Sequence, residues 1–120
     1  MPPTRLGFPR TSRLLRPGQF TATMRRGHRS RDNFFTVYAL PNAMPQSRLG
    51  LTVSRRCAPQ AVARNTIKRH IREMFRSYRP LQPSLDIVVV AQSPAAGAGA
   101  DVLRRSLDAH WSRLESLCAR

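Results

Sequence analysis

Hydrophobic residues recur along the chain in strand-like patterns in three segments. Residues 34–40, FFTVYAL, are rich in aromatic and β-branched side chains, and residues 48–54, RLGLTVS, place an apolar residue at every second position; each segment predicts a strand. The uninterrupted apolar segment 85–92, LDIVVVAQ, is typical of a central strand buried on both faces. The sequence HRSR at 28–31 is a candidate for a short edge strand.

Alternation along a strand assigns its side chains to two faces of a sheet. In the first predicted strand it places four side chains on one face: Phe34, Thr36, Tyr38 and Leu40. In the second it points three apolar side chains one way: Leu49, Leu51 and Val53. The other face of the second strand carries only Gly50, Thr52 and Ser54, so we expect it to be low and open.

Hydrophobic residues at helical spacing predict three helices, of which two precede the last strand. Residues 12–27 carry a short pattern in which Phe20 and Met24 lie one turn apart. Residues 58–78 predict the long helix, with Pro59 in its first turn.

The last 20 residues, 101–120, predict a closing helix with Asp101 as its N-cap. Five side chains recur there at helical spacing and predict a core-facing stripe: Leu103, Leu107, Trp111, Leu114 and Cys118. The preceding SPAAGAGA, 93–100, predicts a flexible loop. Residues 1–11 are rich in proline and lack periodicity, so we expect a loose arm followed by a single domain over 12–120.

The predicted order is helix, strands, helix, strand, helix. A chain of 120 residues supports one domain, and one mixed sheet with helices packed against it is the economical arrangement of these elements. We therefore expect an α+β fold.

The net charge of the chain limits the classes of partner that it can bind. Twenty-one Lys and Arg face six Asp and Glu, for a formal net charge of +15, which favours nucleic acid as the partner and an anionic membrane as the second candidate. No apolar segment is long enough to span a bilayer, and the first residues lack the apolar core of a secretory signal. We expect a cytoplasmic protein without a membrane partner. Cys57 and Cys118 suggest neither a disulfide framework nor a zinc site.

The long helix concentrates positive charge on one side. On a helical projection six polar side chains fall together: Arg64, Asn65, Lys68, Arg69, Arg72 and Arg76. The apolar seam on the other side includes Ile67 and Ile71, and Glu73 is the one acid nearby. Like charges one turn apart repel each other, so this pattern favours a polyanion-binding surface over a merely solvated face.

The sequence of this helix also resembles that of a known protein family. Residues 64–73, RNTIKRHIRE, match the pattern R-N-x-x-K-R-x-x-R-E and resemble the signature helix of the bacterial ribonuclease P protein family. FPRTSRLLRPGQF (8–20), RLGLTVSRRC (48–57) and LDIVVVAQ also resemble that family's segments, in the same order. The signature positions correspond to five residues here: Arg64, Asn65, Lys68, Arg69 and Arg72. We add Arg76, Arg55 and Arg56 as candidate RNA-binding residues.

The resemblance implies a single-domain α/β sandwich, with a mixed four-stranded sheet, three helices and a left-handed βαβ crossover. It also implies a partner: a large catalytic RNA with bound Mg²⁺ that removes the 5′ leader from precursor tRNA, with one protein for each RNA. The long helix is expected to contact RNA. A cleft between helix and sheet is expected to hold the leader.

Aromatic side chains in a positive groove bind single-stranded RNA by stacking on its bases. Phe20 and Tyr38 match positions where the family has leader-contacting aromatics, and Phe34 is a further candidate. Met24 is a fourth candidate for the leader-binding cleft. It departs from the family pattern, in which an aromatic is common, but a methionine can still pack on a base. Core packing is the alternative for each aromatic ring.

A nuclease site within the protein is not expected. The six carboxylates form no tight pair: Asp32, Glu73, Asp86, Asp101, Asp108 and Glu115. The three histidines are dispersed: His28, His70 and His110. We expect no catalytic residue and no metal site within the protein, with the chemistry carried by the RNA. The alternative is a weak Mg²⁺ contact shared with the RNA, which the sequence does not locate. A ribosomal or RNA-packaging protein is the alternative function, and a membrane-active basic protein is a third.

Overall fold

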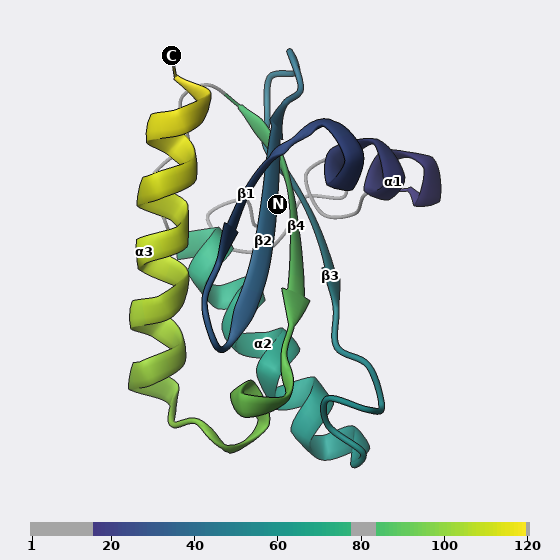
Figure 1. The fold of residues 1–120 in the computed structure, drawn as a ribbon, viewed down its shortest axis with the longest axis vertical. Helices are drawn as coiled ribbons and strands as arrows, with labels where there is room; N and C mark the ends of the chain where they lie inside the picture. The colour runs from purple at the N-terminus through teal and green to yellow at the C-terminus, as the bar shows by residue number, and fades with distance from the viewer. Residues whose placement is uncertain (1–15, 78–83, 120) are drawn as a thin grey trace, which may run out of the picture.

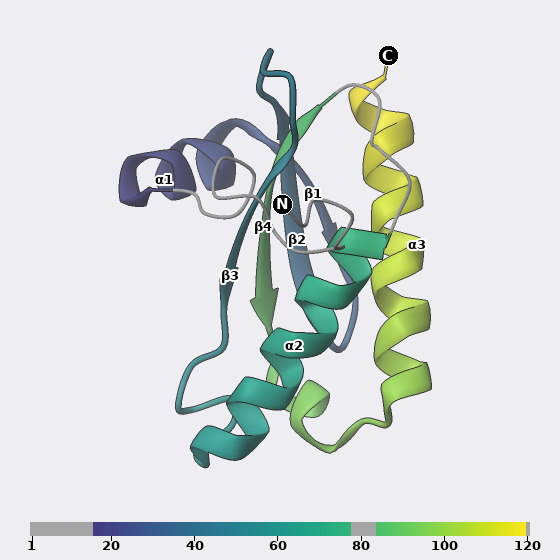
Figure 2. The same ribbon diagram turned by 180° about the vertical axis from the view of Figure 1, so that it is seen from behind.

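The computed structural model describes residues 16–77 and 84–119, in which helices cover both faces of one sheet (Figures 1 and 2). The predicted arm, residues 1–11, and the predicted helix end at Tyr78 lie outside the described residues. The elements, in chain order, are α1 (Pro17–Arg26), β1 (His28–Arg31), β2 (Phe35–Pro41), β3 (Arg48–Thr52), α2 (Ala61–Ser77), β4 (Leu85–Ala91), the short 3₁₀ helix η2 (Ser93–Gly97) and α3 (Ala100–Cys118).

The four strands form one mixed sheet in the order β1-β2-β4-β3. β1 pairs with β2 and β2 with β4 in antiparallel fashion, whereas β3 and β4 are parallel. β2 and β3 follow each other in the chain but do not pair, because β4 lies between them. The predicted α+β class, with a mixed four-stranded sheet and three α-helices, is confirmed.

The connection from β3 through α2 to β4 is left-handed. Figure 2 shows α2 in front of the sheet, with both strands running downward and β4 to the right of β3. When the view is turned so that the strands run upward, the chain steps to the left. Such connections are right-handed in ~98% of cases, so the crossover implied by the family resemblance is an exception, and it is present here.

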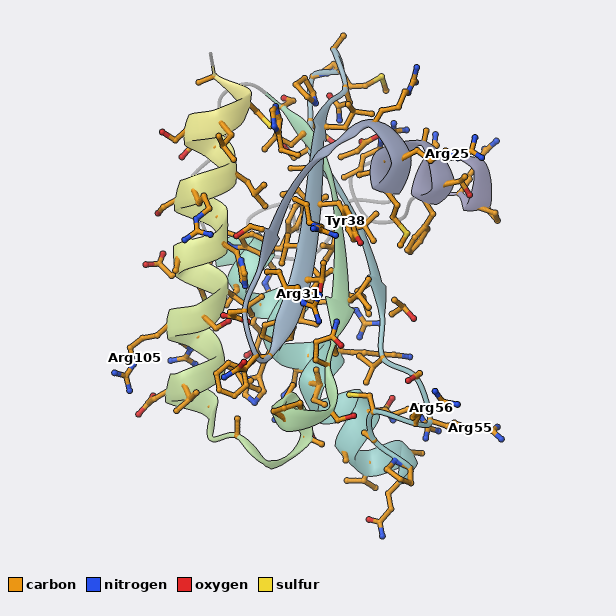
Figure 3. The ribbon with its side chains drawn as sticks, in the orientation of Figure 1. Arg25, Arg31, Tyr38, Arg55, Arg56 and Arg105 are labelled. Carbon is orange, nitrogen blue, oxygen red and sulfur yellow. The ribbon has the colours of Figure 1, made fainter. Side chains whose placement is uncertain are left out.

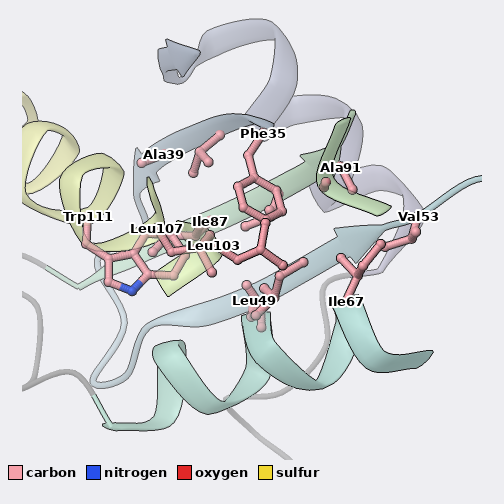
Figure 4. Close-up of a cluster of buried hydrophobic side chains, with 14 of the residues drawn as sticks. Phe35, Ala39, Leu49, Val53, Ile67, Ile87, Ala91, Leu103, Leu107 and Trp111 are labelled. Atoms are coloured by element: carbon pink, nitrogen blue, oxygen red, sulfur yellow. The ribbon is translucent and has the colours of Figure 1, made fainter. Parts of the chain in front are cut away.

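The hydrophobic core lies between the sheet and the pair α2 and α3 (Figure 4). Phe35, Val37 and Ala39 of β2 alternate toward it, and Ile67 and Ile71 of α2 are buried in it. All five residues of the predicted α3 stripe are buried. β4 is buried on both faces along most of its length, as its continuous apolar sequence predicts.

Two helix starts differ from prediction. α2 begins at Ala61, so Pro59 precedes the helix instead of lying in its first turn. The reason is a turn just before it, in which the Ala58 amide donates to the Ser54 carbonyl. α3 begins at Ala100, with extended Gly99 as its N-cap, and Asp101 lies inside the first turn.

The predicted flexible loop after β4 contains the ordered 3₁₀ helix η2. Ala95 in its middle is buried in the core, and its amide donates to the carbonyl of Gln92. A small apolar side chain therefore anchors a segment whose Gly and Ala content predicted mobility. No helix within the described residues is long and apolar enough to cross a membrane.

Candidate nucleic-acid interface

The long helix α2 has the two-sided character that its sequence predicts. Ile67 and Ile71 are buried against the rest of the fold. The polar residues on the other side are exposed or half-exposed: Arg64, Asn65, Lys68, Arg69, Arg72 and Arg76. Within residues 16–77 and 84–119 none of these cations forms an ion pair with a carboxylate. The helix therefore presents uncompensated positive charge to solvent.

Arg64 has a second task that the sequence pattern did not indicate. Its Nη1 donates hydrogen bonds to the carbonyl oxygens of Ala58 at 3.0 Å and Pro59 at 2.9 Å. These bonds hold the turn that precedes α2. A guanidinium has five N–H donors, so Arg64 keeps donors for a phosphate while fixing the start of the helix.

The face of the sheet turned away from α2 and α3 is a second surface, here called the open face. It consists of the outward side chains of the strands, and α1 packs across one end of it, on β2 and β4 (Figure 1). Register places two rows of side chains across it: Arg29, Tyr38, Val88 and Gly50 in one, and Arg31, Thr36, Val90 and Thr52 in the next.

Two predicted leader-binding aromatics belong to this side of the molecule. Tyr38 and Phe20 are both half-buried, and neither is part of the core cluster beneath α2 and α3. Thr23 of α1 is buried, and Met24, 41% exposed, leaves its side chain accessible. The structure therefore sets Phe20 and Met24 on α1 and Tyr38 on the sheet that α1 covers.

Phe34 does not join them. β2 begins one residue later, at Phe35, and the half-buried Phe34 ring packs against the hydrophobic core. The prediction that Phe34 shares a face with Tyr38 is wrong because alternation applies only within the strand. Its contacts support the core alternative for this ring.

The next row of the open face contains an ion pair, because register places Arg48 of β3 beside Asp86 of β4. Arg48 donates from Nε to Asp86 Oδ1 and from Nη2 to Oδ2, both at 2.8 Å, and Asn42 Nδ2 also donates to Oδ1, at 2.9 Å. The hydrogen bonds to Asp86 raise the pKa of Arg48. The carboxylate of Asp86 is thereby satisfied within the protein.

A polar network fastens β1 to α3 on the core side of the sheet. The hydroxyl of Ser30 lies 2.7 Å from His110 Nδ1, and both residues are buried. His110 Nε2 lies 3.2 Å from Asp32 Oδ2 without forming a hydrogen bond to it, so the two side chains form an ion pair only when His110 is protonated. Burial lowers the pKa of His110, and the nearby Asp32 carboxylate opposes this only in part.

Asp32 joins this network to the turn between β1 and β2. Its Oδ1 accepts hydrogen bonds from the amides of Phe34 at 2.8 Å and Phe35 at 2.9 Å, and its Oδ2 accepts a short one from the Ser106 hydroxyl. Burial acts to raise the pKa of Asp32, but these hydrogen bonds and the charge of His110 outweigh it, and the pKa is lowered. One carboxylate therefore ties the β1–β2 turn to α3.

Comparison with known proteins decides the family. The family model described as Ribonuclease P matches residues 8–115 of this chain. The chain belongs to the ribonuclease P protein family.

Relatives of known name agree. The ribonuclease P protein component of Methylococcus capsulatus is 42% identical over 113 residues, which cover 94% of this chain and 88% of that protein. The one from Escherichia coli O157:H7 is 37% identical over 109 residues, covering 91% and 92% of the two chains.

Solved structures agree as well. The Staphylococcus aureus RNase P protein is 32% identical with a TM-score of 0.75, covering 84% of this chain and 92% of that one. The Thermotoga maritima RNase P protein is 29% identical with a TM-score of 0.74, covering 85% and 96%.

Family membership establishes which ribonucleoprotein the chain belongs to and what that ribonucleoprotein does. The chain is the RNA-binding protein subunit of ribonuclease P, the ribonucleoprotein that matures the 5′ end of tRNA, and its partner is the RNA subunit of that enzyme. The RNA-binding residues predicted on α2 lie together on one exposed surface, and Arg55 and Arg56 lie exposed on the connection from β3 to α2 (Figure 3).

Sequence reasoning missed the cations of the open face. Arg29 and Arg31 of β1 are exposed and stand beside Tyr38 and Thr36 in the sheet register. They lie outside the segments on which the family resemblance was recognised. The available signal was local: in HRSR a small polar residue separates two arginines, so alternation places both arginines on one face.

Proposed function

We propose that the protein uses its two surfaces for two different RNAs. The cationic side of α2, with Arg55 and Arg56, binds the RNA subunit, and the open face with α1 binds the single-stranded 5′ leader of precursor tRNA. The observation that carries this division is the sheet itself. α2 covers one face and α1 lies across the other (Figures 1 and 2), so both RNAs can be bound at once.

The chemistry of each surface fits its proposed ligand. α2 offers cations and an amide without aromatic rings on its outer side, which suits the phosphate backbone of a folded RNA. The open face combines Tyr38 with Phe20 and Met24 of α1, and base stacking on such side chains suits a single strand. The half-buried position of Tyr38 leaves part of its side chain accessible while the sheet holds it rigidly.

We place the Mg²⁺ ions of the reaction on the RNA subunit. Among the described residues no three His, Cys, Asp or Glu side chains come together in a way that could hold a metal ion. The carboxylates of Asp32 and Asp86 accept hydrogen bonds from Ser106 and Arg48, respectively. The protein contributes by neutralising phosphates, which lowers repulsion between leader and RNA and eases Mg²⁺ binding there. One protein acts with each RNA, in the cytoplasm.

The test is reconstitution of the particle with its cognate RNA at low Mg²⁺. Cleavage of precursor tRNA is measured for the RNA alone, the protein alone and the two together. We expect the protein to accelerate cleavage and to lower the Mg²⁺ requirement, with no cleavage by protein alone. Turnover by RNA-free protein that a single carboxylate substitution abolishes would show that the chemistry belongs to the protein.

A further inference from the structure

The edge strand β1 presents two arginines to the same face as Tyr38. β1 contains His28–Arg31, and within it Ser30 is buried while Arg29 and Arg31 are exposed. Side chains of a strand alternate between faces, and Ser30 points toward α3, where its hydroxyl meets His110. Arg29 and Arg31 therefore point to the open face, where Figure 3 shows Arg31 near Tyr38.

The Ser30–His110 pair also fixes this arrangement. A slip of β1 by one residue relative to β2 would exchange the faces of all its side chains. It would bring an arginine against α3 and break the 2.7 Å contact between the Ser30 hydroxyl and His110 Nδ1. The buried pair thus holds both arginines on the open face.

No acid nearby neutralises these arginines. Asp32 is the adjacent carboxylate in the chain, but its two oxygens accept hydrogen bonds from the Phe34 and Phe35 amides and from the Ser106 hydroxyl. Neither Arg29 nor Arg31 forms an ion pair in the part of the chain that the structure describes. Charged side chains on an edge strand discourage pairing with another chain, but that role does not depend on which face they occupy. Here both arginines lie on the face of Tyr38, and Arg29 stands directly opposite it.

We propose that Arg29 and Arg31 are phosphate-binding residues that hold the backbone of the single-stranded leader along β1, beside the stacking platform at Tyr38. This inference rests on the proposed leader-binding function and extends it by assigning the path of the strand. The backbone runs at the β1 edge and the bases point inward over β2 toward α1.

Register gives the inference its geometry. Arg29 stands directly opposite Tyr38, and Arg31 opposite Thr36. Neighbouring strands lie ~4.8 Å apart, and alternate residues of one strand ~6.8 Å apart. Tyr38 and Arg29 are thus placed to take the base and the phosphate of one nucleotide, and Arg31 is placed for the phosphate of a neighbouring nucleotide. Arginine suits this role because its planar group can bind a phosphate with two hydrogen bonds.

The experiment uses the reconstituted particle with the variant Arg29→Gln/Arg31→Gln. Affinity is measured for mature tRNA and for precursors with leaders of increasing length, each over a range of salt concentrations. The matched control is Arg104→Gln/Arg105→Gln, which removes the same charge from exposed positions on α3, away from the open face. Arg29→Lys/Arg31→Lys is a second variant that keeps the charge at both positions.

The measured quantity is the difference in log affinity between precursor tRNA and mature tRNA, followed as a function of salt concentration. Loss of two phosphate contacts to a single strand should make the salt slope of that difference shallower by about 1.4, and should weaken precursor binding roughly tenfold at low salt. Mature tRNA binding, the α3 control and the salt slope of the lysine variant should be unchanged. Because both arginines are exposed, the melting temperature should not move.

Two other outcomes overturn the inference. An unchanged salt slope for the leader contribution would show that the arginines touch no leader phosphate, and equal weakening of mature tRNA would assign them to the tRNA body or the RNA subunit. Tyr38→Ala separates this failure from failure of the proposed function. If Tyr38→Ala removes the benefit of the leader and the arginine variant does not, only the backbone path is wrong. If neither has an effect, the open face is not the leader site.

Discussion

At the scale of a single residue, Tyr38 belongs both to the sheet and to the proposed leader-binding surface. It lies in the middle of β2, its neighbours Val37 and Ala39 point into the core, and its own side chain points to the other face, half-buried. The backbone of Tyr38 is therefore rigid while its ring stays partly accessible. A pre-positioned ring loses little freedom on binding, which favours stacking over a mobile contact.

Replacement of Tyr38 should separate stacking from packing. Tyr38→Ala should weaken binding of leader-carrying precursors by roughly 1–3 kcal/mol, the usual value of one base–aromatic stack, and should leave mature tRNA nearly unaffected. Tyr38→Phe keeps the ring and should behave almost like the native protein. The measurement is affinity of the reconstituted particle against leader length. Equal weakening of all substrates, or an effect mainly on melting temperature, would assign the ring to the core.

His110 should make stability depend on pH. Burial holds its pKa below the ordinary value of 6.5, so the unfolded chain binds the proton more readily than the folded one. The free energy of unfolding therefore falls as pH drops below about 6.5, toward the lowered pKa of the folded state. Asp32, whose pKa is also lowered in the fold, adds a further loss below about 3.8 as its carboxylate is protonated.

The measurement is melting temperature between pH 7.5 and pH 5.5. His110→Asn keeps an acceptor for the Ser30 hydroxyl but cannot titrate in this range, so its melting temperature should depend less on pH, whatever its absolute value. His28→Asn, at an exposed position, is the matched control and should keep the native dependence. If His110→Asn retains the full native slope, His110 is not the titrating group.

Gly27 occupies a position with no room for a side chain. A Cβ atom there would lie 2.6 Å from the Thr23 carbonyl oxygen and 2.7 Å from the Ala39 carbonyl oxygen. Gly27→Ala should therefore lower the free energy of unfolding by about 1–3 kcal/mol, as overpacking does, because the α1–β1 junction must move off β2. Gly18→Ala is the control: nothing lies within 4 Å of its Cβ, and the helix should gain stability. Equal stability of the two variants would contradict the close approach.

At the scale of the element, α2 is a phosphate-binding surface held by its apolar side. About five cations contacting phosphate should give a slope of log K against log salt of about −4, between the limits for single strands and duplexes. Arg69→Ala or Arg72→Ala should each reduce that slope by somewhat less than one, since both side chains are exposed. Arg104→Ala on α3 should leave it unchanged. A salt-independent affinity for the RNA subunit would rule out an electrostatic interface on α2.

The elements that the sequence predicted well are those with long, one-sided periodicity. Ile67 and Ile71 mark the buried side of α2, a helix of 17 residues, and Leu103 and Trp111 mark that of α3, a helix of 19 residues. Such patterns average out local exceptions. Alternation inside β2 likewise separates Tyr38 from its neighbours Val37 and Ala39, which belong to the core cluster.

What the sequence could not predict depends on contacts that hydrophobic periodicity does not encode. Pro59 suits a first helical turn in isolation, but the bonds from Arg64 to Ala58 and Pro59 hold it in the preceding turn. The order of η2 depends on burial of Ala95. The handedness of the crossover goes against the general rule and came only from family resemblance. Alternation in HRSR places both arginines of β1 on one face of the sheet, but only the contact of Ser30 with His110, 80 residues away, identifies which face that is.

At the scale of the whole molecule, charge is distributed unevenly. Three of the six acids, Asp101, Asp108 and Glu115, lie on α3, together with Arg104, Arg105 and Arg113, so this helix is close to neutral. Among the described residues, the cations without an ion pair lie mainly on α1, along β1, on the connection from β3 to α2 and on α2. We therefore expect α3 to face solvent in the assembled particle while RNA contacts the other sides.

Sheet order predicts when protection develops during folding. β3 has β4 as its strand partner, so β3 amides should become protected from hydrogen exchange only in the phase in which β4 is protected. The β1–β2 pair is local and can form earlier. Pulse-labelling during refolding measures both. Protection of β3 before β4 would mean that β2 and β3 first pair with each other in a non-native sheet.

The place of β4 also has a consequence for synthesis on the ribosome. Since β4 comes after α2 in the chain and lies between β2 and β3 in the sheet, a nascent chain that ends at α2 contains two apolar strands without their shared neighbour. Leu85–Ala91 must leave the exit tunnel before these strands are joined. Until then the exposed strands are carried on a strongly cationic chain, whose self-repulsion keeps unfinished copies apart. The charge that serves RNA binding in the finished protein thus acts as a solubilising device in the unfinished one.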